Sequence, residues 1–122
     1  MIVATSLAAL ALLGADVAAV PSGAQVLEPA FGGTIVSTYA DGSVSKLWLN
    51  RDGTFTSEGR HHDRRAGRWI VKGHDVCLSQ LKPFPIPFAS YCQPIPAVAL
   101  TDTWTGKAVT GEPITNRLVA ER

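Results

Sequence analysis

Apolar and polar residues alternate in short stretches through most of the chain. In the stretch 43–50, Leu47 and Leu49 share one face of an extended strand, and Val44 and Trp48 share the other. Alternation with a period of two is typical of strands that turn one side to a core and the other to water. No long stretch shows helical periodicity, so the pattern predicts strands.

Turn residues separate these strands at short spacing. Asp41-Gly42 and Asp52-Gly53 suit hairpin turns that need a positive φ, and Gly73 marks the turn of a hairpin over 67–80. The residues expected to point inward are Phe55, Trp69, Val71, Val76, Leu78, Trp104, Ile114 and Leu118. The sequence therefore predicts an all-β domain, an antiparallel meander of seven or eight strands that closes into a small barrel or a flattened sandwich.

The N-terminal region differs from the rest of the chain. Residues 2–14 are apolar and uncharged, and small residues precede two candidate cleavage sites, after Ala19 and after Ala24. We predict a signal peptide over 1–24, a linker over 25–30 and a single domain over 31–122. Lys and Arg are missing before the apolar run. Asp16 interrupts it early, which disfavours a membrane-spanning helix.

Composition narrows the compartment and the partners. The formal net charge is only +1, and loss of Asp16 with a signal peptide would add one, so we expect neither a nucleic-acid partner nor stable membrane insertion after cleavage. Two cysteines in an exported chain predict a disulfide between Cys77 and Cys92. Two free thiols or an intermolecular bridge remain the alternative. We expect a periplasmic or secreted protein.

Catalytic and metal-binding signals are weak. His61, His62 and Asp63, with His74 and Asp75 further on, are the residue types that bind metals, but they lack the compact zinc spacings. We interpret them as a solvated loop and a turn, and we expect no metal, no cofactor and no catalytic residues. Hydrolysis by two carboxylates that meet in space stays open, although most acidic residues lie in turns.

Two segments are candidate binding surfaces. Five of the 11 basic residues lie between positions 60 and 72, among them Arg60, Arg64 and Arg65, and they could contact an acidic partner or an envelope polymer. A charged loop that protects the sheet is the alternative. The second segment is 82–88, in which Phe84, Ile86 and Phe88 alternate with prolines. These three side chains could bind a partner or fold back to plug one end of the barrel.

The chain resembles a group of small exported bacterial lipocalin-like β-barrel proteins, most of them uncharacterised. The resemblance covers roughly residues 33–93 and lies in Asp52-Gly53-Thr54-Phe55, Gly67-Arg68-Trp69, Gly73-His74-Asp75-Val76-Cys77-Leu78 and Cys92. Gly67-x-Trp69 is similar to the lipocalin Gly-x-Trp signature, which there lies near the first strand and here in about the fourth. The resemblance implies a barrel fold and export, and it carries no shared catalytic residues.

These observations lead to two functional hypotheses. The first is a non-enzymatic exported binding module that acts on an unknown protein or envelope component through the proline-rich and arginine segments. The second is a lipocalin-like carrier of a small apolar ligand, since a barrel of about eight strands can hold one. Trp48, Trp69 and Trp104 would then be candidate walls of the cavity. A small metal-dependent enzyme is a third and weaker hypothesis.

Overall fold

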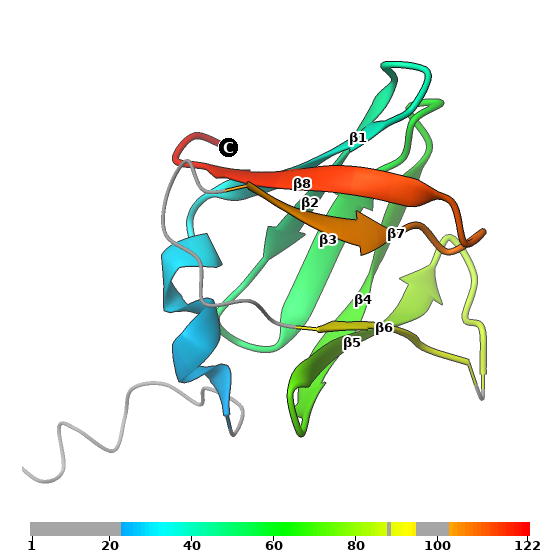
Figure 1. Cartoon of the computed structure of the whole chain (residues 1–122). Helices are drawn as coiled ribbons and strands as arrows, with labels where there is room; N and C mark the ends of the chain where they lie inside the picture. Colours follow the sequence, from blue (N-terminus) through cyan, green and yellow to red (C-terminus); the bar gives the residue numbers. More distant parts are fainter. Residues whose placement is uncertain (1–22, 88, 95–102) are drawn as a thin grey trace, which may run out of the picture.

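A computed structural model describes residues 23–87, 89–94 and 103–122 of the chain (Figure 1). Eight antiparallel strands form one sheet in the order β6-β5-β4-β3-β2-β1-β8-β7, and the sheet curls into a nearly closed barrel. The elements are η1 (Ala24–Ala30), β1 (Thr34–Tyr39), β2 (Val44–Leu49), β3 (Thr54–Glu58), β4 (Arg64–Lys72), β5 (Asp75–Lys82), β6 (Tyr91–Pro94), β7 (Thr103–Lys107) and β8 (Pro113–Val119). The prediction of an all-β barrel is confirmed.

The predicted alternation places the expected residues inside the barrel. Leu49, Phe55, Trp69 and Leu118 are buried, and Leu47, Val71, Val76, Leu78 and Trp104 pack against them. The charged loop after β3 is short, because Arg64 already pairs with Glu58 and begins β4. The charged side chains of the β3–β4 hairpin lie outside the core, so they do not prevent the two strands from pairing.

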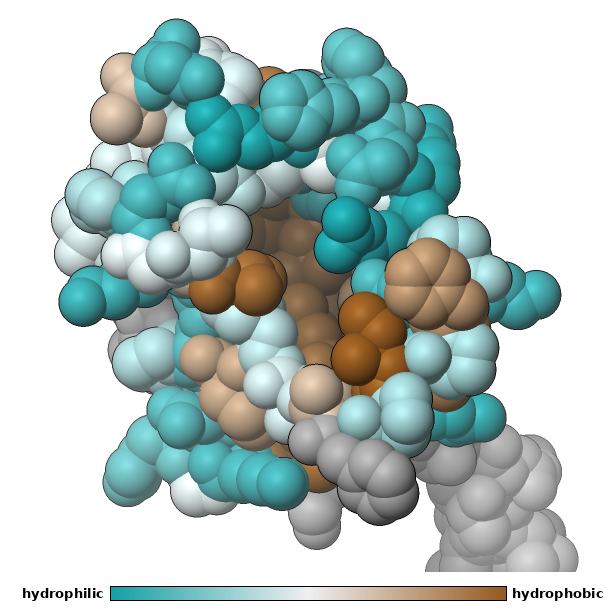
Figure 2. Space-filling model, turned by 90° about the vertical axis from the view of Figure 1, so that its right-hand side faces the viewer, coloured by the Kyte–Doolittle hydropathy of each residue, from teal (hydrophilic) through white to brown (hydrophobic). Residues whose placement is uncertain are grey.

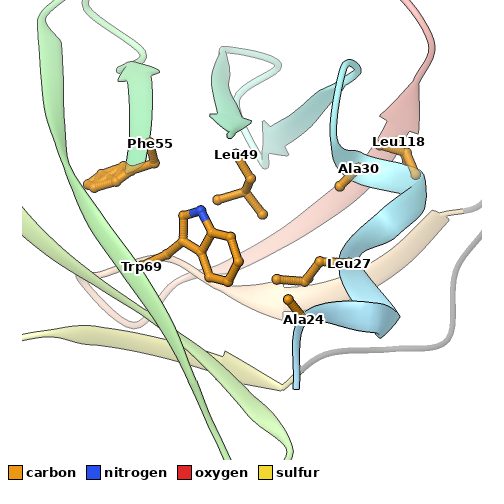
Figure 3. Packing of buried hydrophobic residues seen from close by; sticks show 7 residues of the cluster. All are labelled: Ala24, Leu27, Ala30, Leu49, Phe55, Trp69 and Leu118. Carbon is orange, nitrogen blue, oxygen red and sulfur yellow. The ribbon is translucent and has the colours of Figure 1, made fainter. Parts of the chain in front are cut away.

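One end of the barrel is closed by η1, a short 3-10 helix (Figure 1). Its Ala24, Leu27 and Ala30 point toward Leu49, Trp69 and Leu118, and all are buried (Figure 3). The sequence predicts a linker over 25–30, whereas these residues complete the core. The signal peptide lies almost wholly outside the described residues, and its expected last residue, Ala24, is the first residue of η1.

The Gly67-x-Trp69 motif has a structural role at this closed end. A Cβ at Gly67 would overlap the carbonyl oxygen of Ser79 and lie 2.9 Å from the Phe55 ring, so only glycine lets these groups approach. Trp69 is 1% exposed, and its Nε1 donates a hydrogen bond to the carbonyl of Asn50 at 2.8 Å. Phe31, directly after η1, stacks on the Trp69 ring at 5.7 Å between centroids.

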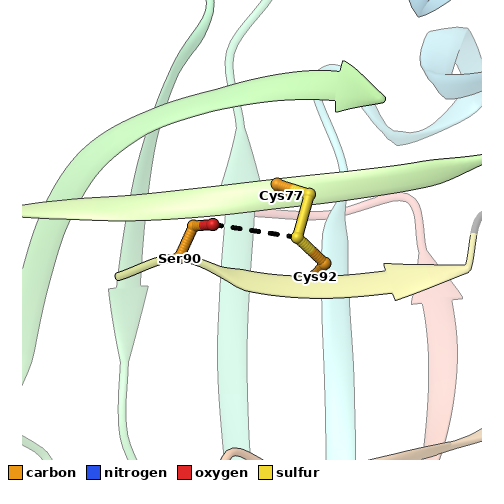
Figure 4. The surroundings of a disulfide bond; sticks show 3 residues. All are labelled: Cys77, Ser90 and Cys92. Carbon is orange, nitrogen blue, oxygen red and sulfur yellow. Dashed lines mark hydrogen bonds between the residues drawn. A yellow bond between two sulfur atoms is a disulfide. The ribbon is translucent and has the colours of Figure 1, made fainter. Parts of the chain in front are cut away.

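Cys77 and Cys92 form a disulfide between directly opposite residues of β5 and β6 (Figure 4). The pairing predicted from the sequence is therefore present, and neither thiol is free. The bond fixes β6, a four-residue strand at the edge of the sheet that ends at Pro94. A disulfide of this kind is consistent with an oxidising, exported location.

Candidate binding cavity

The barrel encloses a cavity of about 900 Å³ that opens at the end opposite η1. Figure 2 looks into this opening and shows an apolar interior inside a mostly hydrophilic rim. The volume lies within the roughly 300–1,000 Å³ of pockets that bind small molecules. The barrel is therefore a cup with room for a ligand.

The floor of the cup is apolar. It is formed by Leu27 and Ala30 of η1 together with Leu49, Phe55 and Leu118 from the strands. Above them, Ile35 lies beside Leu47 of β2 and Leu118 of β8 in the strand register. A molecule that reaches this depth would exchange water for aliphatic and aromatic surface, which favours apolar ligands.

A ring of polar and aromatic side chains lies one layer above the floor. Ser37 of β1 pairs with Ser45 of β2 and with Asn116 of β8, and Asn116 pairs with Trp104 of β7. All four residues line the cavity, and we call them the polar ring. Their polar groups can orient a ligand inside the cavity.

Asn116 is the most deeply buried member of the polar ring, at 2% exposed. The Ser37 hydroxyl donates a hydrogen bond to its Oδ1 at 2.6 Å. Its Nδ2 is buried and has no acceptor among the residues that the structure describes. A buried donor without a partner is uncommon, since desolvation then has no compensation.

Arg60 connects three loops at the mouth of the cup. Its guanidinium lies 2.7 Å from Asp41 Oδ2, 3.4 Å from Glu112 Oε1 and 3.9 Å from the centre of the Tyr39 ring. Its Nε donates to the Ser43 hydroxyl at 3.0 Å. These contacts join the loop after β3 to the β1–β2 and β7–β8 turns, so they hold the rim of the cavity together.

Asp41, one of the two acidic partners of Arg60, stays ionised over a wide pH range. Hydrogen bonds from the hydroxyl and the backbone N–H of Ser43 lower the pKa of Asp41 to about 2, and Arg60 adds to the shift. The carboxyl is exposed. The ion pair at the mouth is therefore present throughout the physiological pH range.

Side chains bridge the two edges of the sheet, β6 and β7. The Tyr91 hydroxyl and Gln93 Nε2 both donate hydrogen bonds to the carbonyl of Lys107, the latter at 2.6 Å. Burial, with a smaller effect from Tyr39, raises the pKa of Tyr91 to about 12, so its phenol keeps the proton that it donates. These bonds close the barrel wall where the strand order ends.

In its described part, residues 82–87, the proline-rich segment lies at the mouth and does not plug the barrel. Phe84 is 60% exposed, while Ile86 lines the cavity at its edge. Gln80 holds the segment, since its Nε2 donates to the Phe84 carbonyl and its own carbonyl accepts from the Ile86 N–H. Phe88 lies outside the described residues. The closed end of the barrel is covered by η1, not by the proline-rich segment.

The three candidate arginines do not share one surface. Arg60 and Arg65 both line the cavity, and Arg65 pairs there with Asp63 at 3.0 Å, whereas the Arg64 guanidinium lies 5.8 Å from the centre of the Trp48 ring. Arg64 and Arg65 are consecutive residues of β4 and therefore point to opposite faces. Each of them has a local partner, and no continuous basic surface results from these three residues.

The histidines lie apart from any metal-binding geometry in the described part of the chain. His61 and His62 are exposed in the loop after β3, and His62 Nδ1 lies 3.1 Å from Glu58 Oε2. His74 lies in the β4–β5 turn. Among residues 23–87, 89–94 and 103–122, no three His, Cys, Asp or Glu side chains gather as a metal would require.

Sequence reasoning did not identify the polar ring or the network around Arg60. The signal was present in the alternation, because Asn116 lies between the inward residues Ile114 and Leu118, and Ser45 precedes the inward residue Leu47 by two positions. Of the three tryptophans proposed as cavity walls, Trp104 lines the cavity. Trp69 lies in the buried core, and Trp48 points outward, where its Nε1 donates to Thr34 Oγ1 at 2.8 Å.

Neither a protein-family model, nor a curated protein, nor a solved structure matches this chain. In the part of the chain that the structure describes, no helix has the length and apolar character needed to cross a membrane. The cavity is therefore the feature of this protein that bears most directly on function.

Proposed function

We propose that this protein is a non-enzymatic binding protein that holds one small, mainly apolar molecule inside its barrel. The observation that carries this proposal is the cavity of about 900 Å³ with an apolar floor and an open mouth. Small inward side chains, such as Ser37, Ser45 and Ser57, leave this space unfilled. The disulfide and the predicted signal peptide support action outside the cytoplasm, in the periplasm or after secretion.

Filling the cavity tests this proposal. Ser57 lines the cavity, so Ser57→Trp is expected to place an indole in the ligand space. The full-length oxidised protein should bind the neutral fluorescent probe phenylnaphthylamine with a saturable rise in emission. The variant should bind it about tenfold more weakly or worse, because the apolar volume is occupied.

A matched control separates occlusion from a general effect of an added tryptophan. Thr56 is the neighbouring residue of β3 and is exposed on the outer face. Thr56→Trp should therefore bind the probe like the unmodified protein. Absence of saturable binding by the unmodified protein, or equal binding by both variants, would contradict the proposal.

A second candidate function is contact with a protein or envelope component through the proline-rich segment. Its support is the 60% exposure of Phe84, which leaves most of the apolar ring accessible to a partner. Phe84→Ser should leave the free energy of unfolding within about 0.5 kcal/mol, since the ring buries little surface. It should also remove any component of an envelope fraction that the oxidised protein retains on a column. Retention unchanged by Phe84→Ser would contradict this second role.

A further inference from the structure

The charged side chains around the cavity limit the type of ligand, in an inference that rests on the proposed function. Within the part of the chain that the structure describes, the charged residues that line the cavity are Lys46, Arg60, Arg65, Glu58, Asp63 and Glu112. Their formal charges cancel, so the rim as a whole attracts neither sign strongly. The bonds that each cation already makes therefore decide which of them can contact a ligand.

Two of the three cations are already matched by carboxylates. Arg60 uses its three guanidinium nitrogens in the network that holds the rim together. Lys46 lies directly opposite Glu58 in the β2–β3 register. A hydrogen bond from His62, with smaller effects from the charges of Arg64 and Lys46, lowers the pKa of Glu58. Neither Arg60 nor Lys46 is therefore the cation best placed for a ligand.

Arg65 differs from both because only one of its nitrogens is engaged. It lies opposite Ser57 of β3, and both residues line the cavity. Its Nε donates a hydrogen bond to Asp63 Oδ2 at 3.0 Å, whereas its terminal nitrogens, Nη1 and Nη2, make no hydrogen bond to the described residues. Asp63 thus orients the guanidinium and leaves its terminal edge open, the edge that matches two oxygens of a carboxylate.

The position of Arg65 suits the polar end of a ligand whose other end is apolar. In the β3–β4 register, Ser57 and Arg65 come two residues after the pair of Phe55 and Gly67, about 7 Å along the strands. Phe55 belongs to the apolar floor. The Arg65 side chain is 53% exposed. A charged group bound to it would keep part of its hydration, so the cost of burying a charge is small there.

We infer that the barrel binds single-chain amphiphiles with an anionic head group, whose oxygens accept hydrogen bonds from Arg65 Nη1 and Nη2. The alkyl chain extends from there over Phe55 to the floor formed with Leu49 and Leu118. A ligand with a neutral head group binds more weakly, because it forms no charge-assisted hydrogen bonds with the guanidinium.

Two probes with the same alkyl chain test this inference. Decanoate has an ionised carboxylate at neutral pH, and decanol has a hydroxyl group in its place. Displacement of phenylnaphthylamine from the full-length oxidised protein gives a dissociation constant for each. Arg65→Gln should weaken the binding of decanoate by about tenfold, since the charge-assisted hydrogen bonds are lost, and should change that of decanol by less than about twofold.

Two further variants make the outcome specific to the Arg65 guanidinium. Arg64→Gln removes the same charge from the neighbouring residue of β4, which lies beside Trp48 on the outer face, and should leave both constants unchanged. Arg65→Lys keeps the charge but not the paired donors, so it should recover only part of the affinity for decanoate. The half-exposed position of Arg65 favours correct folding of both substitutions there.

The results separate this inference from the proposed function. If neither probe displaces phenylnaphthylamine and the dye itself does not bind, the proposed function fails. If decanol binds and decanoate does not, the cavity holds apolar molecules but has no site for an anionic head group. Equal affinity of Arg65→Gln and the unmodified protein for decanoate, or equal losses in Arg65→Gln and Arg64→Gln, would likewise overturn the inference and leave the proposed function intact.

Discussion

Replacement of Trp69 by alanine is expected to lower the free energy of unfolding by about 3–5 kcal/mol, the range for removing a fully buried large aromatic side chain. Trp69 is 1% exposed and lies between Leu27, Leu49 and Phe55 at the closed end of the barrel (Figure 3). The variant also loses the hydrogen bond to the Asn50 carbonyl. Urea denaturation followed by circular dichroism measures the change.

Trp48 provides a matched control for this substitution. It is half-buried on the outer face of β2 and makes one hydrogen bond to Thr34. Trp48→Ala should cost about 1 kcal/mol and should not change binding of phenylnaphthylamine. Equal losses for the two tryptophans would contradict a core centred on the closed end.

Removal of the disulfide is expected to have the next largest effect. Cys77 and Cys92 are 15 residues apart in the sequence, and a loop of that length predicts a loss of about 3 kcal/mol on replacing both residues by alanine. For a domain of this size, that is a large part of the net stability. Without the bond, β6 is held to β5 by a four-residue ladder alone.

The position of the loss can also be measured. Loosening of β6 moves Tyr91 and Gln93 away from the Lys107 carbonyl, so amide hydrogen exchange should rise first in β6 and β7. Trp69 and its neighbours should keep their protection. A reducing agent should destabilise the unmodified protein and leave the double alanine variant unchanged. Uniform exchange across all strands would argue against a local role for the disulfide.

Much of the fold could be predicted because it depends on local patterns. The inward positions of Leu47, Leu49 and Phe55 follow from a period of two, and the turns at Gly42 and Gly53, which both have a positive φ, follow from their Asp-Gly dipeptides. Register between neighbouring strands is set by the same alternation, since a slip of one residue would expose every buried side chain. These features need no knowledge of distant residues.

The candidate site was less predictable because its residues come from distant parts of the chain. Arg60 meets Asp41 and Glu112 through a sequence separation that no local pattern encodes. Ser37 and Asn116 are 79 residues apart and meet only because β1 pairs with β8. Phe84, a large apolar side chain of the proline-rich segment, lies instead on the surface.

Local patterns of residues are enough to show that the chain forms strands, which residues of each strand face inward, and which two cysteines can pair. The folded barrel was needed to show that η1 covers one end, that the other end stays open, and that inward serines leave a cavity. The physical reason is that alternation assigns a side chain to a face of a strand, which is a local property. Whether that face encloses space or is filled depends on side-chain volumes summed over all strands of the closed sheet.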